Sequence, residues 1–565
     1  MATTTLSDPQ TAPAVAPADA AGRQPWQPYQ RVLFRIAFPF FILLSLPSDV
    51  GWYKNLVSID WLHGHYRDVY DLARFSPSFF LKGGGEGAAP VLLGYDKWFI
   101  ALGIALVIGI IWTLLDRKRA EYEVLYYWLR VIVRFRAGIG IIGFGFTKVF
   151  PTQMPYPSIG LLNSDFGDMT AQKIFWLQVG IVPWYQVFAG VVETLAGVLL
   201  FFRRTTFLGA ALLVGALGDI VFVNFAYDGG VHVYSSYFVL LGVFLLVQDI
   251  PNVYNLLVRE RYTVPRHYYP QFRAAWLRFT RLGLKAATIG IFLVYLTYLE
   301  YLNFRYDPYK QPAQQGVPAL RGLYNVTEFR LNGQTLPYSP LDSVRWQQAT
   351  FEKWTTLTYK VNRPLKLDLS NGGGAAMRDI NRTFETTGLA GGQRVFYYDA
   401  DTVDHTLYLQ SKIRTGDGRK REAKPASQAI AQAGAPRGSS IPAAHDNGYG
   451  GDSGGSYVGT DAAAQQAKYQ ASLAQWISPA ALARIGDETT KINPSAYSTR
   501  RERGIRAEQR PEKRDHLVLA YQATDGGKHV VLRGINEKKD SLYVVLDRVD
   551  RKYTLSPSTL VAGQY

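Results

Sequence analysis

The chain has 565 residues, which is room for two or three domains, and it carries a formal net charge of +16. It has no cysteine, which excludes thiolate catalysis, disulfide bonds and cysteine-ligated metals. Many arginines and lysines flank long apolar runs, and this placement indicates membrane topology rather than nucleic-acid binding. Because those runs end near residue 302, the sequence predicts a membrane half followed by a soluble half, with no nucleic-acid partner.

Residues 1–28, rich in Ala, Thr and Pro, predict a disordered cytoplasmic tail. A membrane span needs about 20 mostly apolar residues, and six later runs meet that requirement. A seventh segment is laden with charge, but counting it as a span places every basic loop on one side, which the positive-inside rule makes cytoplasmic. The sequence therefore predicts an α-helical polytopic bundle of about seven spans within 29–302, with its N-terminus inside. These spans are 31–47, 97–115, 124–150, 183–202, 205–226, 233–250 and 283–302.

The loop 48–96 is long for a connection between two spans. Its stretch 50–72 has an amphipathic pattern, so we expect this stretch to lie along the membrane surface.

Ionisable residues inside a bilayer are costly, so each of them is a candidate functional residue. Glu193 stands out because Gly190 and Gly197 share its helical face and let a neighbouring helix approach closely. At 1.5 Å per residue, Glu193 and Arg136 lie roughly 15 and roughly 20 Å below the outer face. We therefore expect Glu193 beside Arg136, and Lys148 nearer Asp219 or the outer water. The candidate intramembrane polar site comprises Lys148, Glu193, Asp219, Arg136 and Asn224.

The same residues have a purely structural interpretation, because buried ion pairs often only set the register of packed helices. Both interpretations stay open at this stage. No catalytic residue is evident, and no set of metal ligands is expected.

Residues 303–565 change to the two-residue alternation of strands, separated by turn signals such as Asn332-Gly333. The succession of short strands predicts a mostly-β extracytoplasmic domain, a small barrel or a sandwich. An insertion at about 413–512 is predicted to be disordered, most clearly near 424–466. Within it we expect a short helix near 469–485 and a solvated, charge-dense stretch at 500–513. No catalytic motif appears in this half, so enzymatic activity remains an open question.

Two segments, GFTKVFP at 145–151 and VETLAGVLL at 192–200, precede a basic turn at 203–206. Together they resemble the DoxX-type family of bacterial membrane proteins, and the resemblance covers about residues 120–255. It implies a location in the bacterial plasma (inner) membrane and a polar core in which Lys148 and Glu193 match the family's Lys and Glu. The added β-rich domain is similar to a larger DoxX-like subgroup. A distant likeness to membrane domains of vitamin K-dependent carboxylase-like proteins implies a quinone as ligand.

Three functions are compatible with these features. The first is a redox-accessory protein that binds a quinone-like or other amphipathic molecule, or a lipid, with Glu193 and Asp219 handling protons beside Lys148. The second is a non-enzymatic scaffold whose external β domain recruits a partner protein of the cell envelope. The third is a transporter, against which the absence of an inverted repeat counts. A cavity lined by Glu193, Asp219 and Lys148 would favour the first, and a tightly packed bundle the second.

Overall fold

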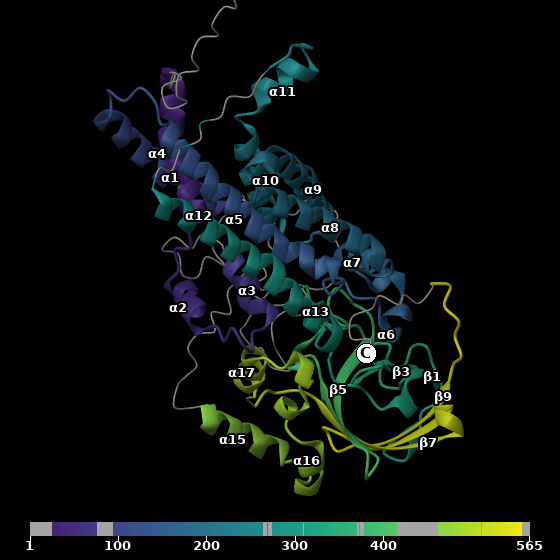
Figure 1. Ribbon diagram of the computed structural model, residues 1–565. Helices are drawn as coiled ribbons and strands as arrows, with labels where there is room; N and C mark the ends of the chain where they lie inside the picture. Colours follow the sequence, from purple (N-terminus) through teal and green to yellow (C-terminus); the bar gives the residue numbers. More distant parts are fainter. Residues whose placement is uncertain are drawn as a thin grey trace, which may run out of the picture.

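The computed structural model describes residues 25–75, 94–263, 274–308, 310–369, 378–414, 462–509 and 511–555, with residues 268, 270 and 372 besides. The helical half and the β domain lie end to end (Figure 1). The helices of the first half are α1 (Pro28–Ser45), α2 (Val50–Ser58), α3 (Tyr66–Ala73), α4 (Asp96–Leu115), α5 (Glu123–Val149), α6 (Ile159–Leu162), α7 (Ala171–Gly180), α8 (Pro183–Leu200), α9 (Thr206–Ala226), α10 (His232–Leu246), α11 (Ile250–Leu257), α12 (Ala275–Ile289) and α13 (Leu296–Tyr306).

The bundle is built around α5. This helix packs along α8, α8 packs against α9, and α9 packs against α10, while α1 contacts both α4 and α5. Glycines allow the closest of these contacts. A Cβ atom on Gly138 would lie 3.1 Å from the Gly197 carbonyl oxygen, and one on Gly197 would lie 2.9 Å from the Gly138 carbonyl oxygen. The small residues that the sequence places on one face of α8 therefore bring α5 and α8 into backbone contact.

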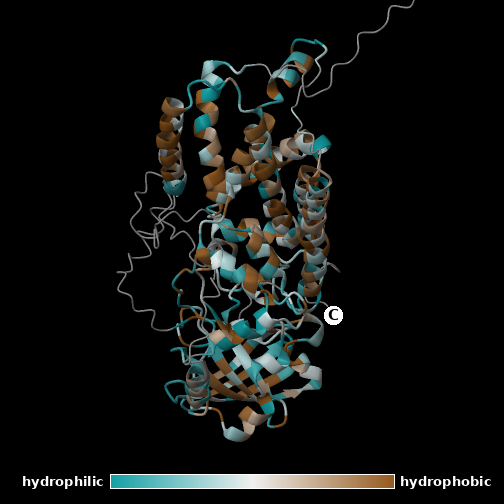
Figure 2. Cartoon of the chain, turned by 60° about the vertical axis from the view of Figure 1, so that its left-hand side comes forward, coloured by the Kyte–Doolittle hydropathy of each residue, from teal (hydrophilic) through white to brown (hydrophobic). Residues whose placement is uncertain are grey.

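Four helices of the described part are long and apolar enough to cross a membrane: α4, α8, Arg203–Ala226 and Ala275–Tyr306. The number rises to six if α1 with α2, and α10 with α11, each form one bent span. Hydrophobic residues make up much of the helices of this half (Figure 2). The chain is thus a membrane protein by the length and composition of its helices. The count of seven spans remains a prediction, because the central helix α5 carries too many charges to meet the same test.

The segment after α1 forms two helices whose surroundings differ. Helix α2 has no buried residue, in keeping with the expected surface location, whereas seven of the eight residues of α3 are buried. Tyr66 and Val69 of α3 pack with Leu296 and Leu299 of α13 and with residues of α5. The prediction that the whole of 50–72 lies along the surface is therefore wrong for α3, because this helix inserts between α5 and α13.

The C-terminal half is a closed meander barrel. Each strand pairs antiparallel with its neighbour in the order β2-β1-β3-β4-β5-β6-β7-β8-β9, and pairing of β1 with β9 closes the ring around β1 and β3 to β9. The predicted turn at Asn332-Gly333 connects β1 to the short β2, with positive φ at both residues. The strands are β1 (Gly322–Leu331), β2 (Gln334–Thr335), β3 (Gln348–Phe351), β4 (Thr356–Lys360), β5 (Gln393–Asp401), β6 (Thr406–Ser411), β7 (His516–Thr524), β8 (His529–Asn536) and β9 (Ser541–Arg548).

Side chains fill the interior of the barrel. Tyr324, Phe351, Leu407, Leu532 and Leu546, none of them measurably exposed, belong to one continuous core contributed by all the ring strands. An eight-stranded barrel is just narrow enough for side chains to fill it. The fold is therefore a packed barrel, which settles the choice between barrel and sandwich that the sequence left open.

The insertion between β6 and β7 contains ordered helices. Residues 415–461, with most of the stretch predicted to be disordered, lie outside the described residues. Beyond them, α15 (Ala462–Leu473), α16 (Pro479–Ile485) and α17 (Thr499–Glu508) follow, with 3-10 turns over Glu488–Lys491 and Pro494–Ala496. The predicted disorder of 413–512 therefore does not extend through 462–508. The expected solvation of 500–513 holds for Arg503, Arg506 and Lys513, which are exposed. It is wrong for Arg501, which is buried where α17 contacts α13 and the segment before β5.

Candidate functional site

Lys148 and Glu193 form a buried ion pair between α5 and α8. The Lys148 ammonium donates to both carboxylate oxygens of Glu193, at 2.9 Å to Oε1 and 2.8 Å to Oε2, and both residues are buried. Gly190 makes room for the pair, because a Cβ atom at this position would lie 2.8 Å from the Lys148 Cβ atom. The predictions that Glu193 lies beside Arg136 and that Lys148 lies nearer Asp219 are both wrong. Each of the two charges is the other's partner.

Arg136 instead holds the C-terminal end of α3. Its guanidinium donates to the carbonyl oxygens of Ala73 at 2.6 Å and Phe75 at 3.0 Å. It also lies over the Phe75 ring, 4.0 Å from its centre. The last carbonyls of a helix lack partners within the helix and carry partial negative charge, so a cation satisfies them well. The function of Arg136 in this structure is to anchor the inserted helix.

The remaining two predicted residues lie apart from the ion pair. Asp219 is on the exposed face of α9. Asn224 is buried, and its amide closes the end of α9 by donating to the Ile220 carbonyl at 2.7 Å and accepting from the Val231 amide at 3.4 Å. Neither residue makes a hydrogen bond or ion pair with Lys148 or Glu193 within the described chain. The predicted five-residue site therefore reduces to one ion pair.

A larger group of buried and half-buried charges lies where the bundle meets the barrel. We call it the junction cluster, and its members are Arg67, Asp68, Asp71, Glu300, Asp307, Asp379, Arg382, Arg500 and Arg501.

The α3 side of the junction cluster is joined to α17. Arg500 donates to Asp68 Oδ1 at 3.2 Å and to Asp71 Oδ2 at 2.5 Å, and Arg67 pairs with Asp71 at 3.0 Å. His65, which caps the start of α3, accepts from the Arg67 amide through Nδ1. Burial, with the nearby charges of Arg500 and Arg501, holds the pKa of His65 well below its ordinary value. His65 is therefore neutral near pH 7, as its role as an acceptor requires.

The barrel side of the junction cluster is a chain of alternating charges. Arg501 pairs with Asp307 at 3.0 Å and with Asp379 at 3.2 Å, and Arg382 donates to Asp307 at 2.7 Å. Asp379 also accepts from the backbone amides of residues 313 and 314, in the segment that leaves α13. Burial opposes the charge of Asp307, yet Arg382 and Arg501 lower its pKa. Each of these four charges has at least one partner of opposite sign, and this pairing makes their burial tolerable.

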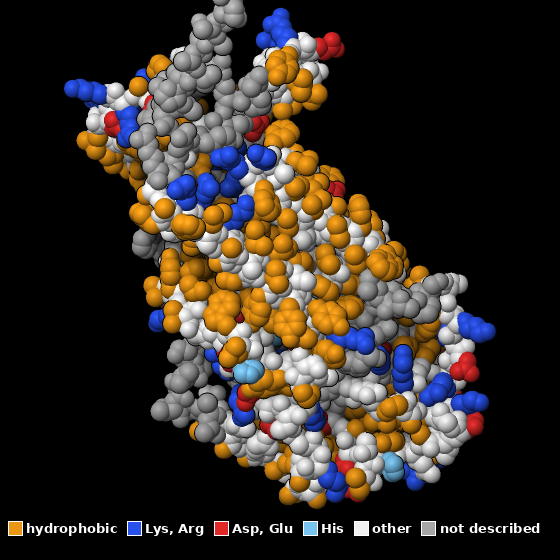
Figure 3. All heavy atoms as spheres, viewed as in Figure 1, with side chains coloured by type: hydrophobic (Ala, Val, Ile, Leu, Met, Phe, Trp, Pro, Cys, Tyr) orange, Lys and Arg blue, Asp and Glu red, His pale blue; other side chains and the backbone are white. Residues whose placement is uncertain are grey.

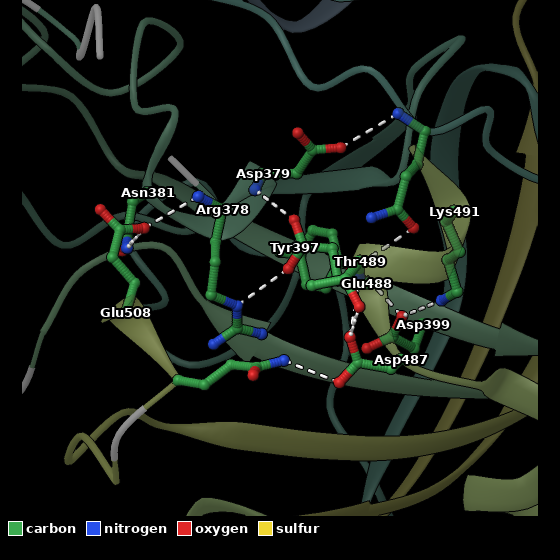
Figure 4. A network of polar contacts seen from close by, with 12 residues as sticks. Arg378, Asp379, Asn381, Tyr397, Asp399, Asp487, Glu488, Thr489, Lys491 and Glu508 are labelled. Atoms are coloured by element: carbon green, nitrogen blue, oxygen red, sulfur yellow. Dashed lines mark hydrogen bonds and ion pairs between the residues drawn. The ribbon is translucent and has the colours of Figure 1, made fainter. Parts of the chain in front are cut away.

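The insertion is attached to the barrel by a continuation of this network (Figure 4). Glu488 accepts from the Arg378 side chain and from the Asp379 amide, each at 2.8 Å. Glu508, at the end of α17, accepts from the Arg378 amide and from Asn381 Nδ2, again at 2.8 Å. These contacts hold α17 beside the barrel, in a position from which Arg500 reaches α3.

Glu300 differs from the other members of the junction cluster, because it forms no ion pair with a described residue. It is 0% exposed, yet neither of its carboxylate oxygens has a hydrogen-bond partner in the described part of the chain. The Asn303 side chain, one helical turn further along α13, is close enough to interact with Glu300, and no other described residue bonds to its amide nitrogen. Arg67 is close enough to act on Glu300 electrostatically. A π-helical stretch, Gly290–Tyr295, precedes these residues, and such stretches frequently occur at functional sites.

Unsatisfied buried polar groups are rare and call for a ligand, a water or a functional role. Glu300 and Asn303 therefore form the part of the helical half best suited to hold the polar head of a small molecule. Among the described residues, no group of three or more histidines and carboxylates is arranged to hold a metal ion.

One signal for this site was present in the sequence. Glu300 is an ionisable residue inside the last apolar run, 283–302, and the rule that selected Glu193 applies to it equally. The charged residues of α3 and α17 offered no such signal. In the sequence they look like solvated charges of a loop and of an insertion, and only the fold brings them together.

Comparison with known proteins gives limited information. No family model matches the chain, and no solved structure matches it. The "Uncharacterized protein YwoB" of Bacillus subtilis (strain 168) is 36% identical over 93 residues, which cover 15% of this chain and 60% of that protein. The chain therefore spans less than two thirds of that relative, and the similarity is a local one.

Proposed function

We propose that this protein is a DoxX-like membrane protein that binds a quinone-like or other amphipathic small molecule, as an accessory to membrane redox chemistry. The proposal rests on one observation: Glu300 and Asn303 are buried side by side on α13, and apart from each other they have no hydrogen-bond partner for these side-chain atoms among the described residues. Glu193 does not support it in the same way, because Lys148 already occupies both of its oxygens.

The chemistry of the two side chains matches such a ligand. A carboxylate oxygen of Glu300 accepts a hydrogen bond from a hydroxyl group, as a quinol provides, and the Asn303 amide donates to a carbonyl oxygen, as a quinone provides. The neighbouring Leu296 and Leu299, which pack against α3 and α5, make the surroundings of the two polar side chains apolar. The ligand would contribute the redox chemistry, and the protein would bind and orient it.

We further propose the bacterial plasma (inner) membrane as the location, with the N-terminus cytoplasmic and the barrel outside. Arg117, Arg119, Arg203 and Arg204 follow α4 and α8 at the bundle end away from the barrel (Figure 1). The positive-inside rule makes that end cytoplasmic.

The test compares small molecules that co-purify with the wild type, Glu300→Gln and Asp219→Asn, identified by mass spectrometry of quinones and lipids. Glu300→Gln keeps the shape but changes the hydrogen bonding, so we expect it to reduce a bound quinone-like species by about tenfold, the effect of roughly 1.4 kcal/mol. Asp219→Asn alters a carboxylate on the exposed face of α9 and is expected to keep the wild-type profile.

An identical profile from the wild type and from folded Glu300→Gln would contradict the proposal. Elution of the variant as a single species in size-exclusion chromatography establishes that it is folded.

A second function is favoured by a different observation, the rigid attachment of a barrel that has a filled interior. Such a domain suits a scaffold that recruits an envelope protein through its outer surface. On that surface Tyr338, Leu341 and Val344 form an exposed apolar stretch between β2 and β3. If the wild type and Glu300→Gln co-purify with identical small molecules, the scaffold function is the one that remains.

A further inference from the structure

Basic side chains from three segments gather at the bundle end away from the barrel. We call them the basic cluster, and its members are Arg134 of α5, Arg203 and Arg204 of the turn after α8, and Arg281 and Lys285 of α12. Lys and Arg side chains are seen gathered on this part of the surface, among hydrophobic ones (Figure 3).

Contacts around Lys285 tie the three segments together. Its ammonium lies 3.9 Å from the centre of the Phe202 ring, directly before Arg203 and Arg204 in the chain. It interacts electrostatically with Arg134 and Arg281. Arg134 in turn donates to Thr206 Oγ1 at 3.4 Å, directly after the same turn. The basic side chains of α5, of α12 and of the turn after α8 therefore lie close together.

The charge balance of this place favours an anion. Neither Lys285 nor Arg204 forms a salt bridge with a carboxylate of the described chain, and the groups that act on Lys285 electrostatically are both cations. Like charges that lie close together repel one another, more strongly beside apolar surfaces than in bulk water. An anion bound between them removes that repulsion. Arginine and lysine together are the usual protein partners of phosphate.

Position and surroundings identify the source of the phosphate as a lipid. Helix α8 has 18 residues, about 27 Å of helix, so the turn that follows it lies about one hydrocarbon thickness from the start of α8 and thus at head-group level. No residue of α12 is buried, and its Trp276, Phe279, Leu282 and Leu284 are exposed, as for a helix surrounded by acyl chains. Basic pockets between membrane helices bind anionic head groups in this way.

We propose that the basic cluster is a binding site for the phosphate head group of an anionic phospholipid. This site lies at the opposite end of the bundle from Glu300. A test that contradicts the small-molecule function therefore leaves the lipid site unaffected, and the reverse also holds.

The test measures binding of phosphatidylglycerol to the full chain in phosphatidylcholine nanodiscs, by native mass spectrometry of the released complexes. The variant Lys285→Gln with Arg204→Gln removes two charges of the cluster. At about 1 kcal/mol for each basic residue near the surface, retention of phosphatidylglycerol should weaken by about 10- to 30-fold. The matched control, Arg259→Gln with Arg261→Gln, removes two charges just after α11, and we expect it to stay within about twofold of the wild type.

Three outcomes would overturn the proposal: no loss in the cluster variant, equal loss in both variants, or displacement of the lipid by inorganic phosphate at millimolar concentration. Equal loss would mean a diffuse electrostatic effect, and displacement would mean a site for free phosphate rather than for a lipid.

Discussion

Two buried carboxylates in the helical half have opposite surroundings. Glu193 receives two hydrogen bonds from Lys148. Glu300 has no ion-pair partner among the residues that the structure describes, and only the Asn303 side chain, one turn away, is close enough to interact with it by hydrogen bonding. A paired carboxylate stabilises packing, because its hydrogen-bonding capacity is already used within the protein. An unpaired one is costly to bury, which is why the ligand hypothesis moves from Glu193 to Glu300.

Separating the two charges of the ion pair tests its structural role. Lys148→Met leaves the Glu193 carboxylate buried without a partner, so we expect a loss of about 3–5 kcal/mol in the free energy of unfolding. The double variant Lys148→Met with Glu193→Met replaces the pair by apolar side chains and is expected to recover most of that loss. The measurement is thermal unfolding in detergent. A double variant as unstable as the single one would show that the ion pair does more than fill a buried space.

At the scale of elements, the unusual feature is α3, a charged helix buried between membrane helices. Arg136 holds its C-terminal end, and Arg500 from α17 holds Asp68 and Asp71 along its length. One carbonyl at its C-terminal end and two of its carboxylates therefore have their partners within the protein. The barrel's insertion thereby controls the position of a helix that contacts α13.

Removal of the Arg500 contact should loosen α3. In Arg500→Gln we expect amide hydrogen exchange in α3 to accelerate by about 10- to 100-fold, because a half-buried charged contact worth about 1.4–2.8 kcal/mol is lost. Arg506→Gln is the control on the same helix, since Arg506 pairs with Glu502 at an exposed position. Exchange rates in α3 that are the same in both variants would show that α17 does not hold α3 in place.

At the scale of the whole molecule, the loop between α5 and α8 also docks on the barrel. Lys173 of α7 donates to the Phe384 carbonyl oxygen, and Lys310 lies 3.5 Å from the centre of the Trp176 ring. Glu352 of the segment after β3 accepts from the Gly160 amide at 2.7 Å. Together with the junction cluster, these contacts make the bundle and the barrel one unit rather than two tethered domains.

This docking should respond to pH through Lys173. Burial lowers the pKa of Lys173 to about 7, whereas the unfolded chain keeps this proton up to about pH 10. Between these values the unfolded state binds more protons, so stability rises with pH by at most about 1.4 kcal/mol per unit. We expect the melting temperature to rise from pH 7 to pH 9, less so in Lys173→Met. Lys491→Gln, which alters a half-exposed pair with Asp399, should keep the wild-type slope. Equal slopes in all three proteins would contradict the assignment.

Much of the architecture was predictable from local patterns. Hydropathy and the change from helical to strand periodicity separate the two halves near residue 302, and the turn at Asn332-Gly333 lies where the pattern placed it. Lys148 and Glu193 were also identified, but their partners were not. Depth along the chain estimates how far a residue lies from the surface, whereas partner choice depends on the rotation of each helix about its axis.

What the sequence by itself determined is the class of this protein: a helical membrane half with buried charges, followed by a domain of short strands. Only the tertiary structure decided which charges meet. Arg500 and Asp68 are 432 positions apart in the chain, and each reads locally as a solvated surface residue. Their contact follows from the docking of the barrel on the bundle, and no local pattern encodes a contact between surfaces that form only after both halves have folded.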